Sequence, residues 1–240
     1  MLLTVDIGNT SISFGVFKGK ELLRSWKVFT NLAISGKPVK LPAAGIDRAI
    51  ISSVAPKATP VIKRTITRKY GIRPLVLGEN IKAPIKNLYR KPRQVGQDRL
   101  VDAVAAKELY GYPAIVVDFG TAITFDVISG RGEYLGGLIF PGIGTSLNAL
   151  SEKAALLPRI TVVPPKGLVG RDTVDSMRSG VFYGIGSLCD GIISKLRKKY
   201  GPVRVIATGG HAEIVAEFSS AIKRIDPHLT LHGLRIIAKY

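Results

Sequence analysis

The chain has 240 residues, of which 46% are hydrophobic, and a formal net charge of +18 at pH 7. This length allows one large domain or two modest ones, and no apolar run approaches the roughly 20 residues that a membrane-spanning helix needs. A single cysteine, Cys189, excludes an internal disulfide and a multi-cysteine zinc site, and we expect it to be buried packing. The N-terminus lacks the features of a signal peptide, so we expect a soluble, cytoplasmic protein without a membrane partner.

The first half of the chain alternates short apolar runs with turn residues and then becomes helical. Gly8-Asn9 and Lys18-Gly19-Lys20 are turn sequences, because glycine and asparagine tolerate a positive φ. The segment 79–95 is polar and contains prolines, which is typical of irregular structure. In chain order the patterns predict strands at 3–7, 11–17, 21–28 and 48–54, a helix at 57–70, a strand at 73–77 and an amphipathic helix at 97–110.

The second half repeats the opening pattern. The patterns predict strands at 114–118, 123–128 and 133–140, helices at 144–153 and 173–200, a strand at 203–208 and a helix at 210–219. Asp6-Ile7-Gly8-Asn9-Thr10 and Asp118-Phe119-Gly120-Thr121 therefore begin equivalent halves. An internal duplication predicts two domains, at 1–113 and 114–240; the alternative is a coincidence between two hairpins with an aspartate at the turn.

The first hairpin offers groups that bind phosphate, although the chain has neither a P-loop nor a dinucleotide-binding glycine motif. Gly8 lets the backbone turn sharply and approach a ligand closely. Backbone N–H groups of the turn, with the hydroxyls of Thr10, Ser11 and Ser13, can bind phosphate oxygens. The carboxylate of Asp6 can hold Mg²⁺ through water.

The second hairpin offers a matching set, with Asp118 for a cation and Gly120 and Thr121 for phosphate. Two such hairpins that face each other across a cleft would clamp a nucleotide. The alternative is that each aspartate caps its own turn through its side chain. Two glycine-containing turns, Thr208-Gly209-Gly210 and Pro141-Gly142, either lie near the nucleotide or are ordinary turns.

Phosphoryl transfer also needs a group that orients and deprotonates the attacking hydroxyl. The best candidate is Asp98 in Gly96-Gln97-Asp98-Arg99, at the start of the helix at 97–110. The alternative is that Asp98 only interacts with the helix dipole, an effect of ~0.3–1 kcal/mol. Arg99 can bind a carboxylate or phosphate with its planar fork, or form a surface ion pair.

The ordered set of motifs resembles the type III pantothenate kinase family over nearly the whole chain. The motifs are Asp6-Ile7-Gly8-Asn9-Thr10, Gly96-Gln97-Asp98-Arg99 with Tyr89 upstream, Asp118-Phe119-Gly120-Thr121-Ala122, Gly136-Gly137 with Pro141-Gly142, Gly170-Arg171-Asp172-Thr173, Thr208-Gly209-Gly210 and Leu229-Thr230-Leu231-His232-Gly233-Leu234. Each motif is common by itself, whereas the ordered set is specific.

The resemblance implies an α/β protein with the actin-like ATPase fold of sugar kinases, Hsp70 and actin, built from two duplicated ribonuclease-H-like domains with mixed sheets. It also implies ATP-dependent phosphorylation of the 4′-hydroxyl of pantothenate, the first step of coenzyme A synthesis. The residues implied for ATP are Asp6, Ile7, Gly8, Asn9, Thr10, Ser11, Ile12, Ser13 and Thr121. Those implied for pantothenate are Tyr89, Gly96, Gln97, Asp98, Arg99 and Thr173, with Asp98 as the catalytic base.

The resemblance further implies a homodimer, in which Thr173 serves the neighbouring subunit's site. It implies a divalent metal, here Mg²⁺ near Asp6, and a monovalent cation, K⁺ or NH₄⁺, held by Asp118. Two positions depart from the family pattern: Gln97 replaces the usual alanine, and Arg171-Asp172 replaces a Lys-Asn-like pair. Both departures bear on substrate affinity and leave every group that the reaction needs.

The positive charge favours anionic partners in general and is unusual for the family. The basic residues are dispersed along the chain and aromatic residues make up only 7%, so a stacking surface for single strands is not evident and we do not expect a nucleic-acid partner. Two alternatives stay open. One is a nonenzymatic regulator that binds DNA in a salt-sensitive way. The other is a kinase of the same fold that acts on another small hydroxylated acid.

Overall fold

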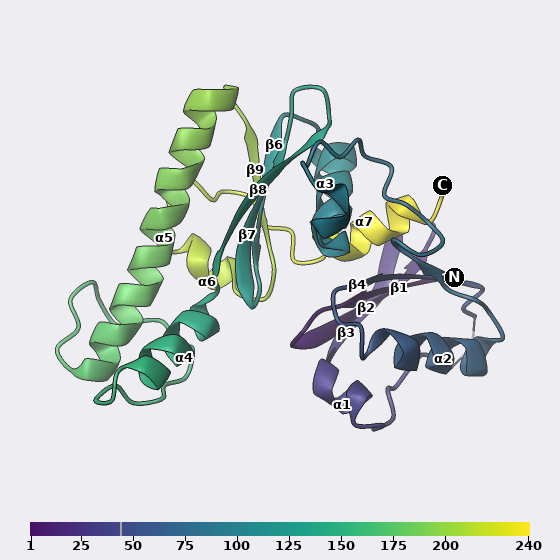
Figure 1. Cartoon of the computed structure of the whole chain (residues 1–240), viewed down its shortest axis with the longest axis horizontal. Helices are drawn as coiled ribbons and strands as arrows, with labels where there is room; N and C mark the ends of the chain where they lie inside the picture. The colour runs from purple at the N-terminus through teal and green to yellow at the C-terminus, as the bar shows by residue number, and fades with distance from the viewer. Residues whose placement is uncertain (44) are drawn as a thin grey trace. The chain divides into compact units, whose positions relative to one another are not determined.

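The computed structural model describes residues 1–43 and 45–240 and divides the chain into two compact units. The first unit consists of Met1–Leu109 together with His228–Tyr240, and the second of Tyr110–Pro227 (Figure 1). The boundary near residue 110 lies close to the expected one at 113. The segment from His228 onward, however, was expected in the second domain and packs in the first unit. The duplicated domains 1–113 and 114–240 stay a prediction.

The first unit is built on a five-stranded mixed sheet with the order β3-β2-β1-β4-β5. Strands β1, β2 and β3 form an antiparallel meander, and β4 and β5 extend the sheet in parallel to β1. The strands are β1 (Leu2–Ile7), β2 (Ser11–Lys18), β3 (Glu21–Phe29), β4 (Arg48–Ser53) and β5 (Leu75–Val76).

Alternating residues of β1 serve the two faces of this sheet, as the period of a strand requires. Leu3 and Val5 belong to a buried cluster that includes Ile62 of helix α2. Leu2 belongs to a second buried cluster that includes Val101 of helix α3 and several residues of helix α7. The helices of this unit are α1 (Thr30–Ile34), α2 (Thr59–Tyr70), α3 (Gln97–Tyr110) and α7 (Leu229–Ile237), with a short 3₁₀ turn at Pro92–Gln94.

Two glycines bring helix α7 close to its neighbours in the first unit. A Cβ on Gly233 would stand 2.5 Å from the carbonyl oxygen of Val101, so only glycine lets α7 approach α3 this closely. A Cβ on Gly15 of β2 would stand 3.2 Å from Leu231 of α7. The sequence patterns predicted neither α1 nor α7. The contacts at Gly233 explain why the segment after residue 228 returns to the first unit.

The second unit has a four-stranded mixed sheet with the order β8-β7-β6-β9, in which β9 is parallel to β6. This order repeats that of β3-β2-β1-β4 in the first unit. The elements are β6 (Ala114–Phe119), β7 (Ala122–Ile128), β8 (Tyr134–Pro141), α4 (Ile143–Lys153), α5 (Thr173–Tyr200), β9 (Arg204–Thr208) and α6 (Ala212–Ala216).

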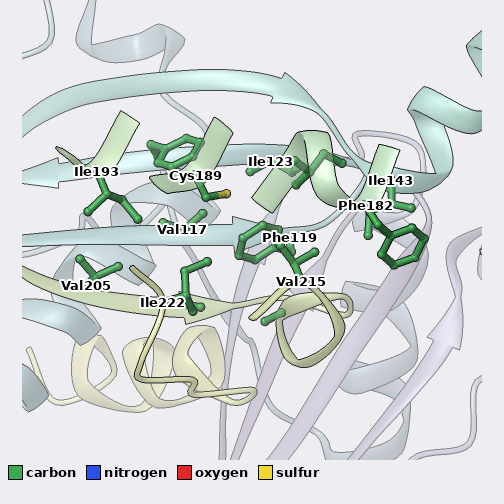
Figure 2. Close-up of a cluster of buried hydrophobic side chains, with 14 of the residues drawn as sticks. Val117, Phe119, Ile123, Ile143, Phe182, Cys189, Ile193, Val205, Val215 and Ile222 are labelled. Carbon is green, nitrogen blue, oxygen red and sulfur yellow. The ribbon is translucent and has the colours of Figure 1, made fainter. Parts of the chain in front are cut away.

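Helix α5 covers one face of this second sheet through an apolar cluster (Figure 2). Phe182, Cys189 and Ile193 of α5 lie among Val117 and Phe119 of β6 in this cluster. Burial, with a smaller effect of the nearby Asp190 carboxylate, raises the pKa of the Cys189 thiol to about 12. Cys189 is thus buried packing, as expected. In the described part of the chain, neither α5 nor any other helix is long and apolar enough to cross a bilayer.

Candidate functional site

The Asp6 hairpin of the first unit lies at the carboxyl ends of the parallel strands β1 and β4. Asp6 is opposite Ser13 of β2 and opposite Ser52 of β4 in the sheet register. The turn is closed by a hydrogen bond from the N–H of Gly8 to the carbonyl of Ser11 at 3.0 Å. A Cβ on Gly8 would stand only 3.0 Å from the same oxygen, so glycine suits this position. The hairpin forms where the sequence predicted it.

Thr30, which begins helix α1, fixes this hairpin from outside the predicted motif. Its hydroxyl donates to the carbonyl of Gly8 at 2.7 Å, and its N–H donates to the carbonyl of Thr10 at 3.0 Å. Thr30 itself is only 1% exposed. Thr30 could not be recognised from the sequence, because the helix that it begins was not predicted. The available signal was a threonine placed directly after the third strand.

The predicted ATP residues of this hairpin fall into two groups by exposure. Asn9 and Thr10 are exposed, and Asp6 is half-buried, so their polar side chains reach solvent at the sheet edge. The side chains of Ile7 and Ile12 are fully buried in the core cluster. Only the backbone of these two isoleucines is therefore available to a ligand at the hairpin.

The turn that carries Asp98 lies at the same edge of the first sheet. A Cβ on Gly96 would stand 3.5 Å from the side chain of Val54, the residue that follows β4. The N–H of Val54 in turn donates to the carbonyl of Ile7 at the end of β1, at 3.0 Å. The first unit thus brings the predicted phosphate hairpin and the predicted catalytic turn together through Val54.

Asp98 stands in the first turn of α3 in a partly desolvated position. Burial raises the pKa of its carboxyl above the usual value of 3.8, while the N–H and the charge of Arg99 oppose that shift. Its Oδ1 accepts a hydrogen bond from the Arg99 N–H at 2.8 Å. A Cβ on Gly96 would collide with this carboxylate, so glycine leaves room for it. A carboxylate with a raised pKa is a stronger base than an ordinary aspartate.

The other predicted substrate residues of the first unit surround Asp98 in sequence but differ in environment. Arg99 is only 8% exposed, so its side chain does not lie on the surface of the protein. The side chain of Gln97 packs over Gly78, with its amide carbon 3.3 Å from the position that a Cβ on Gly78 would occupy. Tyr89 is half-buried in the irregular segment before α3, and its N–H donates to Asn87 Oδ1 at 2.9 Å.

The second unit carries the Asp118 hairpin at the equivalent place in its sheet. Asp118 lies opposite Thr124 of β7 and opposite Thr208 of β9, as Asp6 lies opposite Ser13 and Ser52. The turn is closed by a hydrogen bond from the N–H of Gly120 to the carbonyl of Ala122 at 3.1 Å. Both acidic residues are thus the last but one of their strand, and each strand has a parallel neighbour.

Gly209 lies directly against the Asp118 hairpin. It has a φ of +94°, and a Cβ there would collide with the Asp118 carboxylate and with the backbone of Phe119. The N–H of His211 donates to the carbonyl of Phe119 at 3.2 Å. Thr208-Gly209-Gly210 was a weak signal in the sequence. The structure assigns its first glycine to close packing beside Asp118, whereas Gly210 has open space around it.

The start of helix α4 holds the loop of Thr121. The carbonyl of Thr121 accepts hydrogen bonds from the N–H of Gly142 at 3.0 Å and from the hydroxyl of Thr145 at 2.7 Å. A Cβ on Gly142 would collide with the backbone carbonyls of Gly120 and Thr121. Pro141-Gly142 was noted in the sequence, but Thr145 was missed because its role depends on the fold.

Thr173 begins helix α5, on a different element from the Asp118 hairpin, and its side chain is exposed. The carboxylate of Asp172 caps this helix by accepting the N–H of Asp175 at 2.8 Å. A Cβ on Gly170 would collide with the backbone of Asp175 and Ser176, so the Gly-Arg-Asp-Thr motif packs against the first turn of α5. Gly170 and Asp172 thus serve to pack and cap the start of α5.

The two hairpins and the Asp98 turn supply the groups that phosphoryl transfer needs. Asp6 and Asp118 offer carboxylate oxygens, the ligands that hard cations prefer. Gly8 in the first unit, and Gly142 and Gly209 in the second, keep the backbone of each hairpin free of side chains. Asp98 offers a base of raised pKa.

Comparisons with known proteins show the family of the chain. The family model described as type III pantothenate kinase matches residues 2–195 of the chain. A protein from Moorella thermoacetica named type III pantothenate kinase is 43% identical over 249 residues, covering 99% of this chain and 98% of its own. A protein of the same name from Geobacter sulfurreducens is 42% identical over 250 residues, again covering 99% of this chain and 98% of its own.

A comparison with solved structures gives the fold. A Sinorhizobium meliloti protein, described provisionally as a 2-dehydro-3-deoxygalactonokinase, superimposes with a TM-score of 0.62 at 14% identity. The match covers 100% of this chain and 98% of that protein. At this identity the likeness shows the fold alone. The chain has the actin-like ATPase fold of the sugar kinases, with two mixed sheets, as the sequence predicted.

Proposed function

We propose, since this chain belongs to the type III pantothenate kinase family, that it transfers the γ-phosphoryl group of ATP to the 4′-hydroxyl of pantothenate. The product is 4′-phosphopantothenate, and the reaction is the first step of coenzyme A synthesis. One structural observation carries the assignment of the base. Asp98, with a raised pKa, stands at the same sheet edge as the Asp6 hairpin. The cytoplasm, which holds ATP, is the proposed location, and the free cysteine fits its reducing conditions.

Asp98 acts as the general base. Its carboxylate accepts the proton of the pantothenate hydroxyl while that oxygen forms a bond to the γ-phosphorus, and the bond to the β-γ bridging oxygen breaks to release ADP. The raised pKa supports this role, because proton transfer is most effective when the pKa of the base approaches the working pH. The hydrogen bond from the Arg99 N–H orients the carboxylate.

The Asp6 hairpin binds the ATP phosphates. Backbone N–H groups of the turn and the hydroxyls of Thr10, Ser11 and Ser13 hold phosphate oxygens, while the Gly8 N–H closes the turn and Thr30 keeps it in place by its two hydrogen bonds. Asp6 holds Mg²⁺ through water. When bound, Mg²⁺ neutralises the charge that develops on the phosphate oxygens.

The Asp118 hairpin holds a monovalent cation, K⁺ or NH₄⁺, and Thr121 contacts ATP. Gly209 leaves the Asp118 carboxylate accessible, where any larger residue would meet it. The bonds from Gly142 and Thr145 to the Thr121 carbonyl hold this loop in one conformation. A monovalent cation bound at Asp118 would supply positive charge that attracts phosphate.

Pantothenate is bound by Tyr89, Gly96, Gln97 and Arg99. The guanidinium of Arg99 is suited to the pantothenate carboxylate, because its planar fork pairs with both carboxylate oxygens. The low exposure of Arg99 supports this role, since burial strengthens a charge-assisted bond.

We also propose a homodimer in which Thr173 serves the site of the partner subunit. Thr173 is exposed at the start of α5. Gly180 and Gly184 of the same helix are exposed, and nothing lies within 4 Å of a Cβ built on either. A helix of a second copy can therefore pack closely on α5 at these positions.

The catalytic proposal is tested by measuring ADP release from ATP and Mg²⁺ with and without pantothenate, in K⁺ and then in Na⁺. We expect release that depends on pantothenate and is faster in K⁺. If ADP release depends on pantothenate but is equally fast in both salts, the cation role of Asp118 is contradicted and the proposed reaction still stands. If the folded protein releases no ADP with pantothenate but does so with another hydroxylated acid, that acid and not pantothenate is the substrate.

The dimer proposal is tested by mixing two inactive variants, Asp98→Asn and Thr173→Val. If Thr173 serves the partner's site, a mixed dimer contains one site with an intact Asp98 and an intact Thr173. Mixing should then restore activity that neither variant has alone. A native chain that is monomeric by light scattering, or a mixture that stays inactive although the subunits exchange, would contradict this arrangement.

A further inference from the structure

A second concave site lies in the first unit, at the end of the sheet opposite the Asp6 hairpin. It is a pocket of about 480 Å³ formed by the start of β1, the turn between β2 and β3, the start of β4 and the end of α7. Leu2 lines this pocket, whereas Asp6 stands near the other end of the same strand. With a rise of about 3.3 Å per residue, the two ends of β1 are separated by roughly 17 Å.

A buried cation lies in the wall of this pocket. Arg235 of α7 is only 5% exposed, and its Nε is buried without a hydrogen-bond acceptor. Within the described residues, no carboxylate lies within ion-pair distance of Arg235. Its guanidinium carbon stands 5.8 Å from the centre of the Phe17 ring, which also lines the pocket. An aromatic face offsets only part of the cost of burying a cation without a counterion.

The exposed part of the pocket is also basic. Lys18 and Lys20 flank the turn between β2 and β3, Arg48 begins β4, and Lys239 follows α7. All four side chains are exposed, so each can swing toward a ligand in the pocket. These residues come from three separate parts of the sequence, and the fold brings those parts together around Arg235.

The acidic residues near the pocket do not neutralise Arg235. Asp47 is the one acid among the described residues that line the pocket, and its carboxylate accepts a hydrogen bond from the ammonium group of Met1 at 2.8 Å. This partner lowers the pKa of the Asp47 carboxyl, although burial opposes the shift. Glu21 lies opposite Lys18 in the register of β2 and β3 but does not line the pocket. The pocket therefore has an excess of positive charge.

We propose that this pocket, which we call the Arg235 pocket, binds a phosphate group, either as inorganic phosphate or as part of a phosphorylated small molecule. Its volume falls in the range of small-ligand sites, ~300–1,000 Å³. Arg235 supplies a planar fork in the wall of the pocket, and charge-assisted hydrogen bonds from such a fork to a phosphate are strong. The lysines and Arg48 add attraction from the rim. Burial also lowers the pKa of the Arg235 guanidinium, as expected for a cation that lacks an anion.

The test compares phosphate binding by three variants of the full chain, measured by calorimetry and by thermal unfolding without nucleotide. The double variant Lys18→Gln/Lys20→Gln removes two rim charges at exposed positions. The variant Arg235→Met keeps the apolar stem and removes the buried charge. The matched control is Lys195→Gln/Lys199→Gln, which changes the net charge equally at exposed positions of α5 in the other unit. Any phosphate bound at the Asp6 hairpin is common to all of them.

For the native chain we expect phosphate at 100-fold its dissociation constant to raise the unfolding midpoint by roughly 5–10 °C. Lys18→Gln/Lys20→Gln should weaken phosphate binding at the pocket about tenfold or more, and the control should bind as the native chain does. Arg235→Met should abolish binding at the pocket and, without phosphate, should unfold at the native temperature or above, because it removes a buried charge. Turnover without phosphate should stay at the native level in the lysine variant.

Equal phosphate binding by the native chain, the lysine variant and the control would overturn the proposal. An Arg235→Met variant that is less stable but binds phosphate normally would assign Arg235 a structural role and also overturn it. If this variant does not fold, the lysine pair alone decides. Binding of glucose 6-phosphate but not of inorganic phosphate would identify an organic phosphate as the ligand. Binding of a DNA duplex at this face without binding of either small anion would contradict a small-molecule site.

Discussion

The carboxylate of Asp118 occupies the space that a side chain at Gly209 would need, because a Cβ at residue 209 would collide with that carboxylate. Gly209→Ala should therefore displace Asp118, weaken ATP binding and reduce activation by K⁺. Because residue 209 has a φ of +94°, backbone strain in the alanine variant should also lower its free energy of unfolding by about 1–2 kcal/mol. Denaturant unfolding and ATP titration measure the two effects.

Gly210→Ala is the matched control for this prediction. It lies one residue further along the same turn, has no positive φ, and a Cβ there meets nothing within 4 Å. We expect stability and ATP affinity close to those of the native chain. Equal behaviour of the two alanine variants would show that the glycine at 209 does not maintain the Asp118 hairpin.

Asp98→Asn should lower turnover by at least ~10² if Asp98 is the general base, because the amide cannot accept the proton. The variant should nevertheless be as stable as the native chain or more stable near pH 7. A carboxyl whose pKa is raised on folding contributes stability only while it is protonated, and this stability is lost as the pH rises through the folded pKa. The asparagine variant does not suffer that loss. Glu108→Gln, an exposed change on the same helix, is the control and should leave both properties unchanged.

The dependence of kcat/KM on pH, which reports pKa values of the free enzyme, gives a second measurement at Asp98. The reaction needs the ionised carboxylate, so the rate should fall as the pH decreases through its pKa. Because burial raises this pKa, the acidic limb should lie above the usual value of 3.8. An acidic limb at or below that value, in an enzyme that stays folded, would be inconsistent with Asp98 as the base.

Thr30→Val should raise KM for ATP about fivefold, because it removes the hydrogen bond from the Thr30 hydroxyl to the Gly8 carbonyl, worth about 1 kcal/mol. The hydroxyl of Thr65 donates to the Val61 carbonyl within α2 at 2.8 Å, so Thr65→Val removes a similar bond away from the hairpin. Both variants should lose some stability. Only Thr30→Val should change KM; a KM change of the same size in both would contradict a positioning role for Thr30.

Asp190 predicts a dependence of stability on acidic pH in the second unit. Burial raises the pKa of its carboxyl, but hydrogen bonds from Ser219, Ser220 and Ala221 outweigh burial and lower the pKa to about 2. The stability from this lowered pKa is present at pH values above 3.8, the usual value, and is lost as the pH falls toward about 2.

Asp190→Asn should accordingly cost ~1–3 kcal/mol at pH 7 and less near pH 2, as measured by denaturant unfolding at both values. Glu213→Gln, an exposed change of the same kind in α6, is the control and should cost little at either pH. A cost for Asp190→Asn that does not change between the two pH values would contradict the linkage.

Much of the sheet framework could be predicted from alternation and turn residues. The predicted strands at 3–7 and 11–17 correspond to β1 and β2, and the predicted helices at 97–110 and 173–200 match α3 and α5. Each of these segments has a clear period and a turn or cap at its ends. The hairpin acids could be placed for the same reason, since each stands near the end of a buried strand.

The remaining features depend on contacts between segments far apart in the sequence. Helix α7 needs a glycine at position 233 because the backbone of Val101 lies against it, and no local sequence pattern reveals that contact. Thr30 and Thr145 are ordinary threonines in the sequence, and their partners are hairpin carbonyls defined by the fold. The Arg235 pocket could not be predicted, because its residues come from the start of β1, the turn between β2 and β3, the start of β4 and the last helix.

The return of α7 to the first unit has a consequence for synthesis on the ribosome. The apolar face made by Leu2, Phe17 and Ile50 is covered in part by Leu231 and Leu234 of α7, which are made after the whole second unit. The second unit is continuous in sequence and can fold as soon as it emerges. Until α7 has been synthesised, the nascent first unit has an exposed apolar face, and chaperones recognise such surfaces. The half of the protein that begins first is thus completed last.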